Sequence, residues 1–377
     1  MGVFVMAERK IKVAEFVSRL ESGGVESMLL NYLSHFSHPE DFDIHIVTQD
    51  INDARCVEQF KKAGYNVDIV THKRKSISKN IIEVFQLLRQ EHFDVVHSHM
   101  TLTNFYVLIL AWLTGTRQLI SHSHNAFISD NPIKRLLWFF LKKINQLTSN
   151  VWITCGYDAG VFLFGRRAMH NGKVILLPNA IDLDKFKFDE HKREVMRSKL
   201  AIRKAEFVVG HIGRFMEQKN HKYLVDVFHE FLRFHPDSKL LLVGTGELEK
   251  NIHEYVDGLG LRDKVIFAGS VQNTWDYYQA MDAFVLPSRY EGLPVVSIEA
   301  QASDLPILMS SNVDHSCAIT DSISFLSVDI DPEIWAKSIL RFIDRKRGKC
   351  VISQIREAHY DICRESKRLE NVYRQEN

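Results

Sequence analysis

The chain has 377 residues, of which 45% are hydrophobic and 25% are charged, and its formal net charge is +1. This composition is that of a globular protein, and the balanced charge excludes a general electrostatic attraction to nucleic acid or to anionic membranes. A chain of this length favours two domains.

The sequence indicates a cytoplasmic protein. The five cysteines are Cys56, Cys155, Cys317, Cys350 and Cys363. None has the spacing of zinc ligands or redox pairs, which is typical of a reducing compartment. The segment Met1–Met6 is too short for a signal peptide, because charged residues follow it at once. No apolar run reaches the roughly 18 residues of a membrane-spanning helix.

Apolar runs and amphipathic stretches alternate through the first half of the chain. The apolar runs, interpreted as buried strands, are Ile11–Val17, Asp43–Thr48, Asn66–Val70, Asp94–His97, Gln118–Ser121, Val151–Cys155 and Val174–Leu177. The stretches with helical periodicity are Val25–Phe36, Asp53–Ala63, Lys79–Gln90, Asn104–Leu113 and Ile133–Leu147. Continuous apolar strands separated by helices are typical of a parallel sheet that is covered on both faces.

The pattern loosens after Pro178 and restarts near Phe207. The strands predicted in this second half are Phe207–His211, Lys239–Val243, Lys264–Phe267, Ala283–Leu286, Pro306–Met309 and Ser324–Ser327. The helices predicted are Asn220–Phe234, Leu248–Leu259, Thr274–Met281, Val295–Ser303, Pro332–Asp344 and Val351–Arg374. We therefore predict an α/β fold with two doubly wound, Rossmann-like domains, residues 1–178 and 179–350, followed by a segment 351–377. Ligands of such sheets bind beyond the carboxyl ends of the strands, so we expect the two domains to face each other across a cleft.

Two adjacent glycines, Gly23 and Gly24, link the first predicted strand to the first predicted helix. Glycine lets the backbone approach a ligand closely, and a helix N-terminus favours an anion. On their own, such glycines are more often plain turn residues. The segment lacks the third glycine and the downstream acid of a dinucleotide-binding motif, and so does Gly244-Thr245-Gly246, which disfavours a nicotinamide-dependent dehydrogenase.

Histidines gather at two predicted strand ends, in His97-Ser98-His99 and in His122-Ser123-His124-Asn125. No carboxylate or cysteine joins either group at metal-ligand spacing, so structural or hydrogen-bonding roles are favoured over metal binding. One histidine at a strand end could hydrogen-bond a substrate, and His124 is our candidate. Three Asp-x-Asp triplets are interpreted as chance spacings. We therefore expect no metal dependence and no cofactor.

The stretch Asn131–Leu147 combines the apolar run Trp138-Phe139-Phe140-Leu141 with lysines and arginines on both sides. Amphipathic basic helices of this kind rest on anionic membrane surfaces. A partly buried domain helix with charged ends is the other interpretation, and the sequence leaves both open. A membrane contact through Ile133–Leu147 would place the protein at the inner face of the plasma membrane.

Gly213 and Arg214 end the first predicted strand of the second half, and Lys219 follows at the start of a helix. A guanidinium and an ammonium at one strand end suit a diphosphate, although a solvated pair is the simpler interpretation if they stand alone.

The stretch Leu286–Ala300 runs from a predicted strand through a turn, Glu291-Gly292-Leu293, into a helix with Pro294 at its first position. The free N–H groups of that helix N-terminus favour an anion. Glu291 and Glu299 flank it, and from Pro294 to Glu299 a helix would rise about 7.5 Å. This suits a ligand with a phosphate in the middle and hydroxyl groups at both ends.

Together these segments resemble the retaining family-4 glycosyltransferases of the GT-B fold, in the branch that assembles capsules and exopolysaccharides. The segments that carry the resemblance are Gly23-Gly24-Val25-Glu26, His97-Ser98-His99, Ser121-His122-Ser123-His124-Asn125, Leu177-Pro178-Asn179-Ala180-Ile181-Asp182, Gly213-Arg214 with Lys219, and Glu291 with Glu299. They span nearly the whole chain, and the Glu-Gly-Leu-Pro opening of the glutamate pair is the most specific. The resemblance implies that the C-terminal helix, within 351–377, returns to the first domain.

The resemblance also implies a role for each residue. The two-glycine loop would approach the donor, His99 would also bind the substrate, and Arg214 and Lys219 would bind the diphosphate. Glu291 would contact the transferred sugar, and Glu299 the ribose hydroxyls. His124, or else His122, would lie near C6 of the sugar. Gly292, Leu293 and Pro294 would form the donor-binding turn.

The expected activity is transfer of a hexose, with retention and without a metal, from a nucleotide diphosphate sugar, in the first instance a UDP-sugar. The acceptor would be a saccharide or a polyprenyl-linked saccharide, and no nucleic acid is expected as a partner. A glycoside hydrolase would also use two carboxylates, but it has no need of Arg214, Lys219 and the glycines. A nucleotide-sugar epimerase of the same fold and a non-catalytic nucleotide-sugar-binding partner in a synthesis complex remain alternatives.

Overall fold

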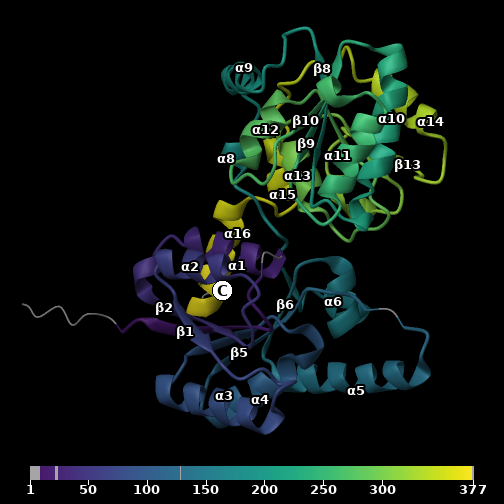
Figure 1. The fold of residues 1–377 in the computed structure, drawn as a ribbon. Helices are drawn as coiled ribbons and strands as arrows, with labels where there is room; N and C mark the ends of the chain where they lie inside the picture. The colour runs from purple at the N-terminus through teal and green to yellow at the C-terminus, as the bar shows by residue number, and fades with distance from the viewer. Residues whose placement is uncertain (1–8, 22–23, 128, 376–377) are drawn as a thin grey trace, which may run out of the picture. The chain divides into compact units, whose positions relative to one another are not determined.

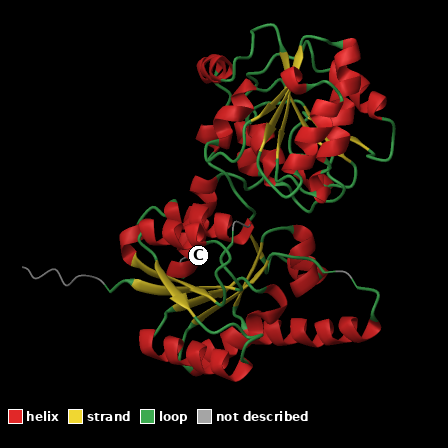
Figure 2. Ribbon diagram, viewed as in Figure 1, coloured by secondary structure: helices red, strands yellow, loops and turns green. Residues whose placement is uncertain are grey.

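The computed structural model describes residues 9–21, 24–127 and 129–375. The chain forms two compact units, Met1–Ala180 with Ile362–Asn377, and Ile181–Asp361 (Figure 1). Each unit is a parallel sheet with helices on both faces, which confirms the predicted α/β class (Figure 2).

The first unit has a seven-stranded sheet in the order β3-β2-β1-β4-β5-β6-β7, and every pairing is parallel. Its strands are β1 (Ile11–Val17), β2 (Phe42–Thr48), β3 (Asn66–Ile69), β4 (Val95–Ser98), β5 (Gln118–Ser123), β6 (Val151–Thr154) and β7 (Ile175–Leu176). Its helices are α1 (Gly24–Ser34), α2 (Ala54–Lys62), α3 (Ile77–Glu91), α4 (Asn104–Leu113), α5 (Pro132–Thr148), α6 (Tyr157–Phe164), α7 (Arg166–His170) and α16 (Ile362–Arg374), with 3-10 turns η1 (Pro39–Asp41) and η2 (Thr101–Thr103).

Alternate residues of β1 enter two different cores, as the strand periodicity requires. Val13 and Val17 face a core that α1, α2 and α16 close, whereas Ala14 and Phe16 face a core that α3 and α4 close. Glu15 lies on the side of Val13 and Val17. The first face of the sheet therefore carries a buried carboxylate at its centre.

The second unit has a six-stranded parallel sheet in the order β10-β9-β8-β11-β12-β13. Its strands are β8 (Phe207–Ile212), β9 (Ser238–Val243), β10 (Val265–Phe267), β11 (Ala283–Leu286), β12 (Ile307–Ser310) and β13 (Ile323–Leu326). Its helices are α8 (Leu183–Phe186), α9 (Glu190–Lys199), α10 (His221–Phe234), α11 (Glu249–Gly258), α12 (Thr274–Ala280), α13 (Val295–Ala302), α14 (Pro332–Leu340) and α15 (Ile352–Glu357), with 3-10 turns η3 (Glu217–Lys219), η4 (Arg262–Lys264) and η5 (His315–Cys317).

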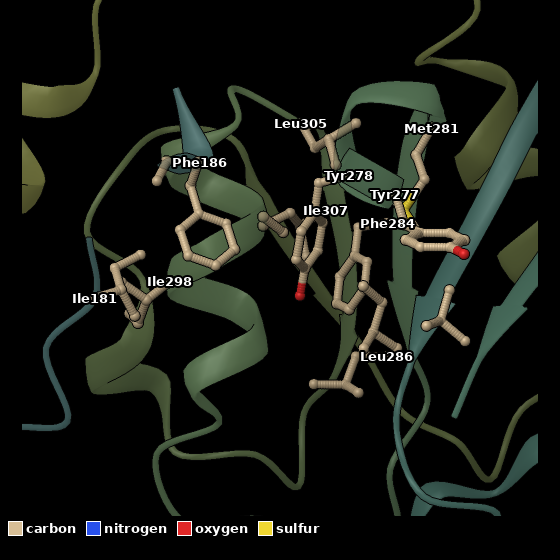
Figure 3. Close-up of a cluster of buried hydrophobic side chains, with 14 of the residues drawn as sticks. Ile181, Phe186, Tyr277, Tyr278, Met281, Phe284, Leu286, Ile298, Leu305 and Ile307 are labelled. Atoms are coloured by element: carbon tan, nitrogen blue, oxygen red, sulfur yellow. The ribbon is translucent and has the colours of Figure 1, made fainter. Parts of the chain in front are cut away.

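Two cores also flank the second sheet. One lies under α10, α11 and α14 and includes Phe228 and Trp335. The other lies under α8, α12 and α13, and Figure 3 shows its aromatic centre, where Tyr278 packs between Phe186 and Phe284 with ring centroids 5.8 and 5.6 Å away. This second core holds α13 against the sheet and so fixes the helix that carries Glu299.

Both sheets begin with the strand order 3-2-1-4-5-6 of a doubly wound fold, as predicted. The prediction of one helix over Val351–Arg374 was wrong. The chain breaks between α15 and α16, where His359 has a left-handed φ of +68°. α15 belongs to the second unit and α16 to the first. The sequence pattern also missed α6, α7 and α8, each of which is eight residues or shorter.

Candidate active site

The strand order of the second sheet reverses between β8 and β11, and ligands of doubly wound sheets bind at such a point. The loops after these two strands are joined by hydrogen bonds. The side-chain amide of Asn220 donates to the carbonyl of Pro287 (3.2 Å), and the N–H of Arg289 donates to the carbonyl of Gln218 (2.8 Å). The predicted site residues of the second half therefore lie at one edge of one sheet.

Lys219 and Glu291 form an ion pair in these loops. Nζ of Lys219 lies 2.7 Å from Oε1 of Glu291, and the two side chains are 14% and 9% exposed. The hydroxyl of Ser288 donates to the same carboxylate oxygen. Breaking a pair this well shielded leaves an unmatched charge, so each partner holds the other in place. The residues expected at the diphosphate and at the sugar are thus in direct contact.

Arg214 is placed differently from Lys219. Its side chain is 69% exposed, and its nearest carboxylate, that of Glu247, lies 3.4 Å away and is itself 58% exposed. An exposed pair of this kind contributes about 0–1 kcal/mol. The guanidinium can therefore leave Glu247 for an anionic ligand at little cost. Arg214 and Lys219 contact separate carboxylates here and do not form one clamp.

Glycines at the ends of β8 and β9 let two loops touch. A Cβ on Gly244 would lie 2.2 Å from the carbonyl oxygen of Gly213, and one on Gly246 would lie 2.4 Å from that of Phe215. A Cβ on Gly213 would press on Nε2 of His211 at 2.9 Å and on the Lys219 side chain at 3.3 Å. Glycine at 244 and 246 therefore allows the loop after β9 to pack against the loop after β8.

The helix α13 begins at Val295, so the prediction that Pro294 is its first residue was wrong. Pro294 is the N-cap, with an extended ψ of 112°, and no side chain of the described residues caps this helix. The N–H of Ser297 donates to the carbonyl of Pro294 (3.0 Å), so the N–H groups of Val295 and Val296 are left for a ligand or for water. The preceding turn is exposed at Gly292 and half-buried at Leu293.

Glu299 lies about one turn into α13. It is bound by a residue that the sequence analysis missed. The hydroxyl of Tyr278 donates to Oε2 of Glu299 at 2.8 Å. Burial raises the pKa of Glu299 to about 7, and the Tyr278 hydrogen bond opposes that rise. Tyr278 sits in an ordinary amphipathic helix pattern, so no local signal in the sequence marks it.

The first unit contributes the glycine loop and the histidines. Gly23 lies outside the described residues. Gly24 is the first residue of α1, and a Cβ there would come within 3.9 Å of the Asn179 side chain, an ordinary contact. Space alone therefore does not require glycine at Gly24.

The histidines are joined by a buried carboxylate that the sequence analysis did not identify. Glu15 of β1 pairs in register with His97 of β4. Oε2 of Glu15 accepts from Nε2 of His99 (2.8 Å), and Nδ1 of His99 lies 2.8 Å from Nε2 of His124. The hydroxyl of Tyr373 in α16 donates to the other oxygen, Oε1, and lies 2.7 Å from Nδ1 of His97. We call these residues, with His122, the histidine network.

Charge in the network is set by burial and by Glu15. Burial opposes ionisation of Glu15, but the charge and hydrogen bonds of His97 and His99 outweigh it and lower the pKa of Glu15 below its usual range. Burial lowers the pKa of His99 to about 4 and those of His122 and His124 well below the usual value. At neutral pH Glu15 is ionised and these three imidazoles are neutral.

His122 and His124 differ in access to ligands. His122 is fully buried, and its Nδ1 lies 3.1 Å from Nε2 of His97, while its own Nε2 has no hydrogen-bond partner within the described part of the chain. His124 is half-buried and stacks on His122 with ring centroids 3.9 Å apart. Of the two, only His124 presents a surface to a ligand.

His97, His99 and His122 also bring possible metal-ligand atoms within 4.8 Å of one another. No carboxylate lies at metal-ligand spacing in the sequence, but Glu15 joins the histidines in the fold, across 84 residues of sequence. Hydrogen bonds already engage both nitrogens of His97 and of His99. The contacts therefore favour a hydrogen-bonded network over a metal centre.

The helix α5 carries apolar side chains on its surface. Those exposed most are Ile133, Leu136, Leu137, Phe139, Phe140 and Leu147. Lys134, Arg135 and Lys143 are exposed among them. Among the described residues, no helix has both the length and the apolar character needed to cross a membrane.

Comparison with known proteins identifies the two halves of the chain. The family model for glycosyltransferase family 4 matches residues 22–185, and the model for glycosyl transferases group 1 matches residues 192–354. The chain is 28% identical over 370 residues to the putative glycosyltransferase EpsF of Bacillus subtilis, with 96% of each chain covered. It is 24% identical to the capsular polysaccharide biosynthesis glycosyltransferase CapH of Staphylococcus aureus, covering 96% of this chain and 98% of CapH.

A further relative has a name that states its donor and acceptor, and a solved structure of similar fold contains a nucleotide. An Escherichia coli UDP-Gal:alpha-D-GlcNAc-diphosphoundecaprenol alpha-1,3-galactosyltransferase is 24% identical over 345 residues, with 89% of each chain covered. The Anabaena protein HepE, solved in complex with UDP and glucose, superposes with a TM-score of 0.69 at 15% identity, over 96% of this chain and 95% of HepE. At that identity the likeness establishes the fold, which is GT-B.

Proposed function

We propose that this chain, which belongs to the family 4 glycosyltransferases, transfers a hexose from a UDP-sugar to a glycan or lipid-linked saccharide in surface polysaccharide synthesis. The observation that carries the proposal is the Lys219–Glu291 pair, set at the strand-order reversal beside the uncapped N-terminus of α13. The names of the relatives support the acceptor class, and UDP in HepE supports the donor.

In the proposed reaction the acceptor oxygen bonds to the anomeric carbon as the bond from that carbon to the diphosphate oxygen breaks. The diphosphate leaves with the electron pair, and one of its oxygens takes the acceptor proton. Attack on the face that the leaving group departs from retains the configuration and needs neither a protein nucleophile nor a metal. Lys219, Arg214 and the N–H groups of α13 stabilise the developing charge. Glu291 holds Lys219 and contacts the sugar, and Glu299 binds the ribose.

Glu291→Ala and Arg214→Ala test this assignment. Each should abolish transfer without unfolding the protein, because each removes a group that the proposed transition state needs. Arg262→Ala is the matched control, since Arg262 is a similarly exposed arginine (62%) that lies 3.5 Å from its nearest carboxylate. Turnover near the wild-type rate in both site variants would refute the assignment.

The assay is incubation with radiolabelled UDP- and GDP-sugars, with and without a lipid-linked acceptor. A transferase labels the acceptor. An epimerase would release free sugar and nucleotide without any acceptor, and a non-catalytic binding partner would bind the nucleotide without turnover.

The exposed apolar surface of α5 supports a further part of the proposal, a contact with an anionic membrane that carries the acceptor. Flotation with anionic and neutral vesicles tests it. Phe139→Ser with Phe140→Ser should weaken binding, because their side chains are 54% and 55% exposed. The control is Ile81→Ser with Ile82→Ser on α3, an exposed apolar pair on another helix of the same unit. Equal flotation of the two double variants would exclude α5 as the contact.

A further inference from the structure

We infer that Glu15 is a positioning residue that acts through His99 and fixes His124 as the tautomer with a bare Nδ1, so that His124 can only accept a hydrogen bond from a substrate hydroxyl. This inference rests on the proposed function for the identity of the ligand. The direction of the hydrogen bonds within the protein does not depend on that function.

The direction begins at Glu15, which is fully buried. Its carboxylate is ionised and can only accept hydrogen bonds. Tyr373 donates to Oε1, and His99 must therefore carry its proton on Nε2 in order to donate to Oε2 at 2.8 Å. A buried carboxylate without these donors would carry a large desolvation cost. The arrangement therefore leaves no freedom in the tautomer of His99 while that ring is neutral.

The next bond follows from the first. A neutral imidazole with its proton on Nε2 has a lone pair on Nδ1. Nε2 of His124 lies 2.8 Å from this atom, so His124 must be the donor. Neutral His124 then carries its only proton on Nε2. Its Nδ1 has a lone pair and no hydrogen.

The position of His124 leaves that lone pair for a ligand. Its backbone N–H is held by Oγ1 of Thr101 at 3.3 Å, and the sulfur of Cys155 lies 3.5 Å from its carbonyl oxygen. The structure shows no hydrogen bond to Nδ1 of His124 from any described residue. Because an acceptor favours a hydroxyl and repels a carboxylate, the network would select a neutral hexose over a uronic acid.

Glu15→Gln reverses the chain of bonds without removing any of them. Tyr373 still donates to the side-chain oxygen, so the new amide group faces Nε2 of His99 and donates to it. His99 then carries its proton on Nδ1 and donates to His124. His124 must now carry its proton on Nδ1, where it can only donate, to a hydroxyl oxygen or to a carboxylate.

The first measurement needs no substrate. In the full-length protein labelled with 15N-histidine, we expect the His124 Nδ1 signal at the position of an unprotonated nitrogen, and a shift to the protonated position in Glu15→Gln; loss of the signals in His124→Gln assigns them. Tyr373→Phe is the matched control, because it removes a buried donor to Glu15 outside the path to His124 and should leave the tautomer unchanged. A protonated Nδ1 in the wild type, an unchanged tautomer in Glu15→Gln, or a flip in Tyr373→Phe would each overturn the inference.

The second measurement uses a UDP-hexose and the UDP-hexuronic acid that carries a carboxylate in place of its C6 hydroxyl group. Glu15→Gln should raise the kcat/KM ratio of the uronic acid to the hexose roughly tenfold or more, because a hydroxyl accepts as readily as it donates, whereas the carboxylate meets a donor only in the variant. An unchanged ratio between the two donors would overturn the role of His124 toward that group. If the wild type turns over no nucleotide sugar, the proposed function fails, while the tautomer measurement still tests the network.

Discussion

Tyr278→Phe should shift the pH at which donor binding becomes strong. The Tyr278 hydroxyl donates to Glu299 at 2.8 Å, and this is the hydrogen bond that keeps the pKa of Glu299 from rising above about 7. In the proposed function the ionised carboxylate accepts the two ribose hydroxyls of the donor. Removing the bond favours the protonated form, which accepts less well.

The size of the shift follows from the strength of the bond. A hydrogen bond to a charged group contributes about 1.5–3 kcal/mol, and about 1.4 kcal/mol corresponds to one pKa unit. The variant should therefore titrate about one to two units above the wild type. At pH 7 about half of the wild-type carboxylate is ionised, compared with about a tenth or less in the variant. We expect kcat/KM for the donor to fall about fivefold or more at pH 7 and to recover toward pH 9.

The assay is kcat/KM for the nucleotide sugar from pH 6 to pH 9 for the wild type, Tyr278→Phe and Tyr277→Phe. Tyr277 is the matched control, because it is a buried tyrosine of the same helix and the structure shows no hydrogen bond from it to Glu299 among the described residues. A midpoint that stays in place or moves down in Tyr278→Phe, or that moves up equally in Tyr277→Phe, would refute the reasoning.

Three further predictions concern stability. Gly244→Ala should lower the free energy of unfolding by about 1–3 kcal/mol more than Gly260→Ala, as measured by thermal denaturation. Both glycines have a positive φ, but only at Gly244 would the new Cβ meet a backbone oxygen, that of Gly213, at 2.2 Å. Asp282→Asn should lower the free energy of unfolding, measured in urea, by about 2–3 kcal/mol. The reason is that the Asp282 carboxylate binds Arg193, Arg197 and the N–H of Val208. A loss below about 1 kcal/mol would contradict this prediction. Glu299→Gln should become more stable relative to the wild type as the pH rises from 4.5 to 7, because the unfolded wild type releases the Glu299 proton near pH 4.5 and the folded wild type keeps it to about pH 7. The full difference in the free energy of unfolding is about 3 kcal/mol. A difference that stays constant between pH 5 and pH 7 would contradict the argument that burial raises this pKa.

The sheets could be predicted because their strands are continuous apolar runs. Ile11–Val17 and Ala283–Leu286 have the predicted bounds in the structure, and most other strands differ by one or two residues. Periodicity says less about short or interrupted helices. The helical pattern is interrupted for four residues between α15 and α16, and neither a proline nor a glycine marks the break.

The site could be predicted only in part. Motif residues such as Lys219 and Glu291 meet because two strand ends are adjacent in the sheet, which the strand pattern implies. Glu15 and Tyr278 were missed because their partners lie 84 and 21 residues away, and local patterns do not report such pairs. One signal was available for Glu15. An acidic residue at the centre of a buried strand requires donors, and the histidines on neighbouring strand ends could supply them.

The return of α16 to the first unit gives the protein an order of assembly during synthesis. The hydroxyl that donates to Glu15 belongs to Tyr373, 358 residues later. When the first 180 residues leave the ribosome, the second unit has still to be made, and one face of the first sheet lacks α16, one of the three helices that close its core. Until α16 is synthesised, the first unit therefore has a partly exposed apolar face, and Glu15 lacks the hydrogen bond from Tyr373. Chaperones would recognise such a state, and truncation before Ile362 would make it permanent.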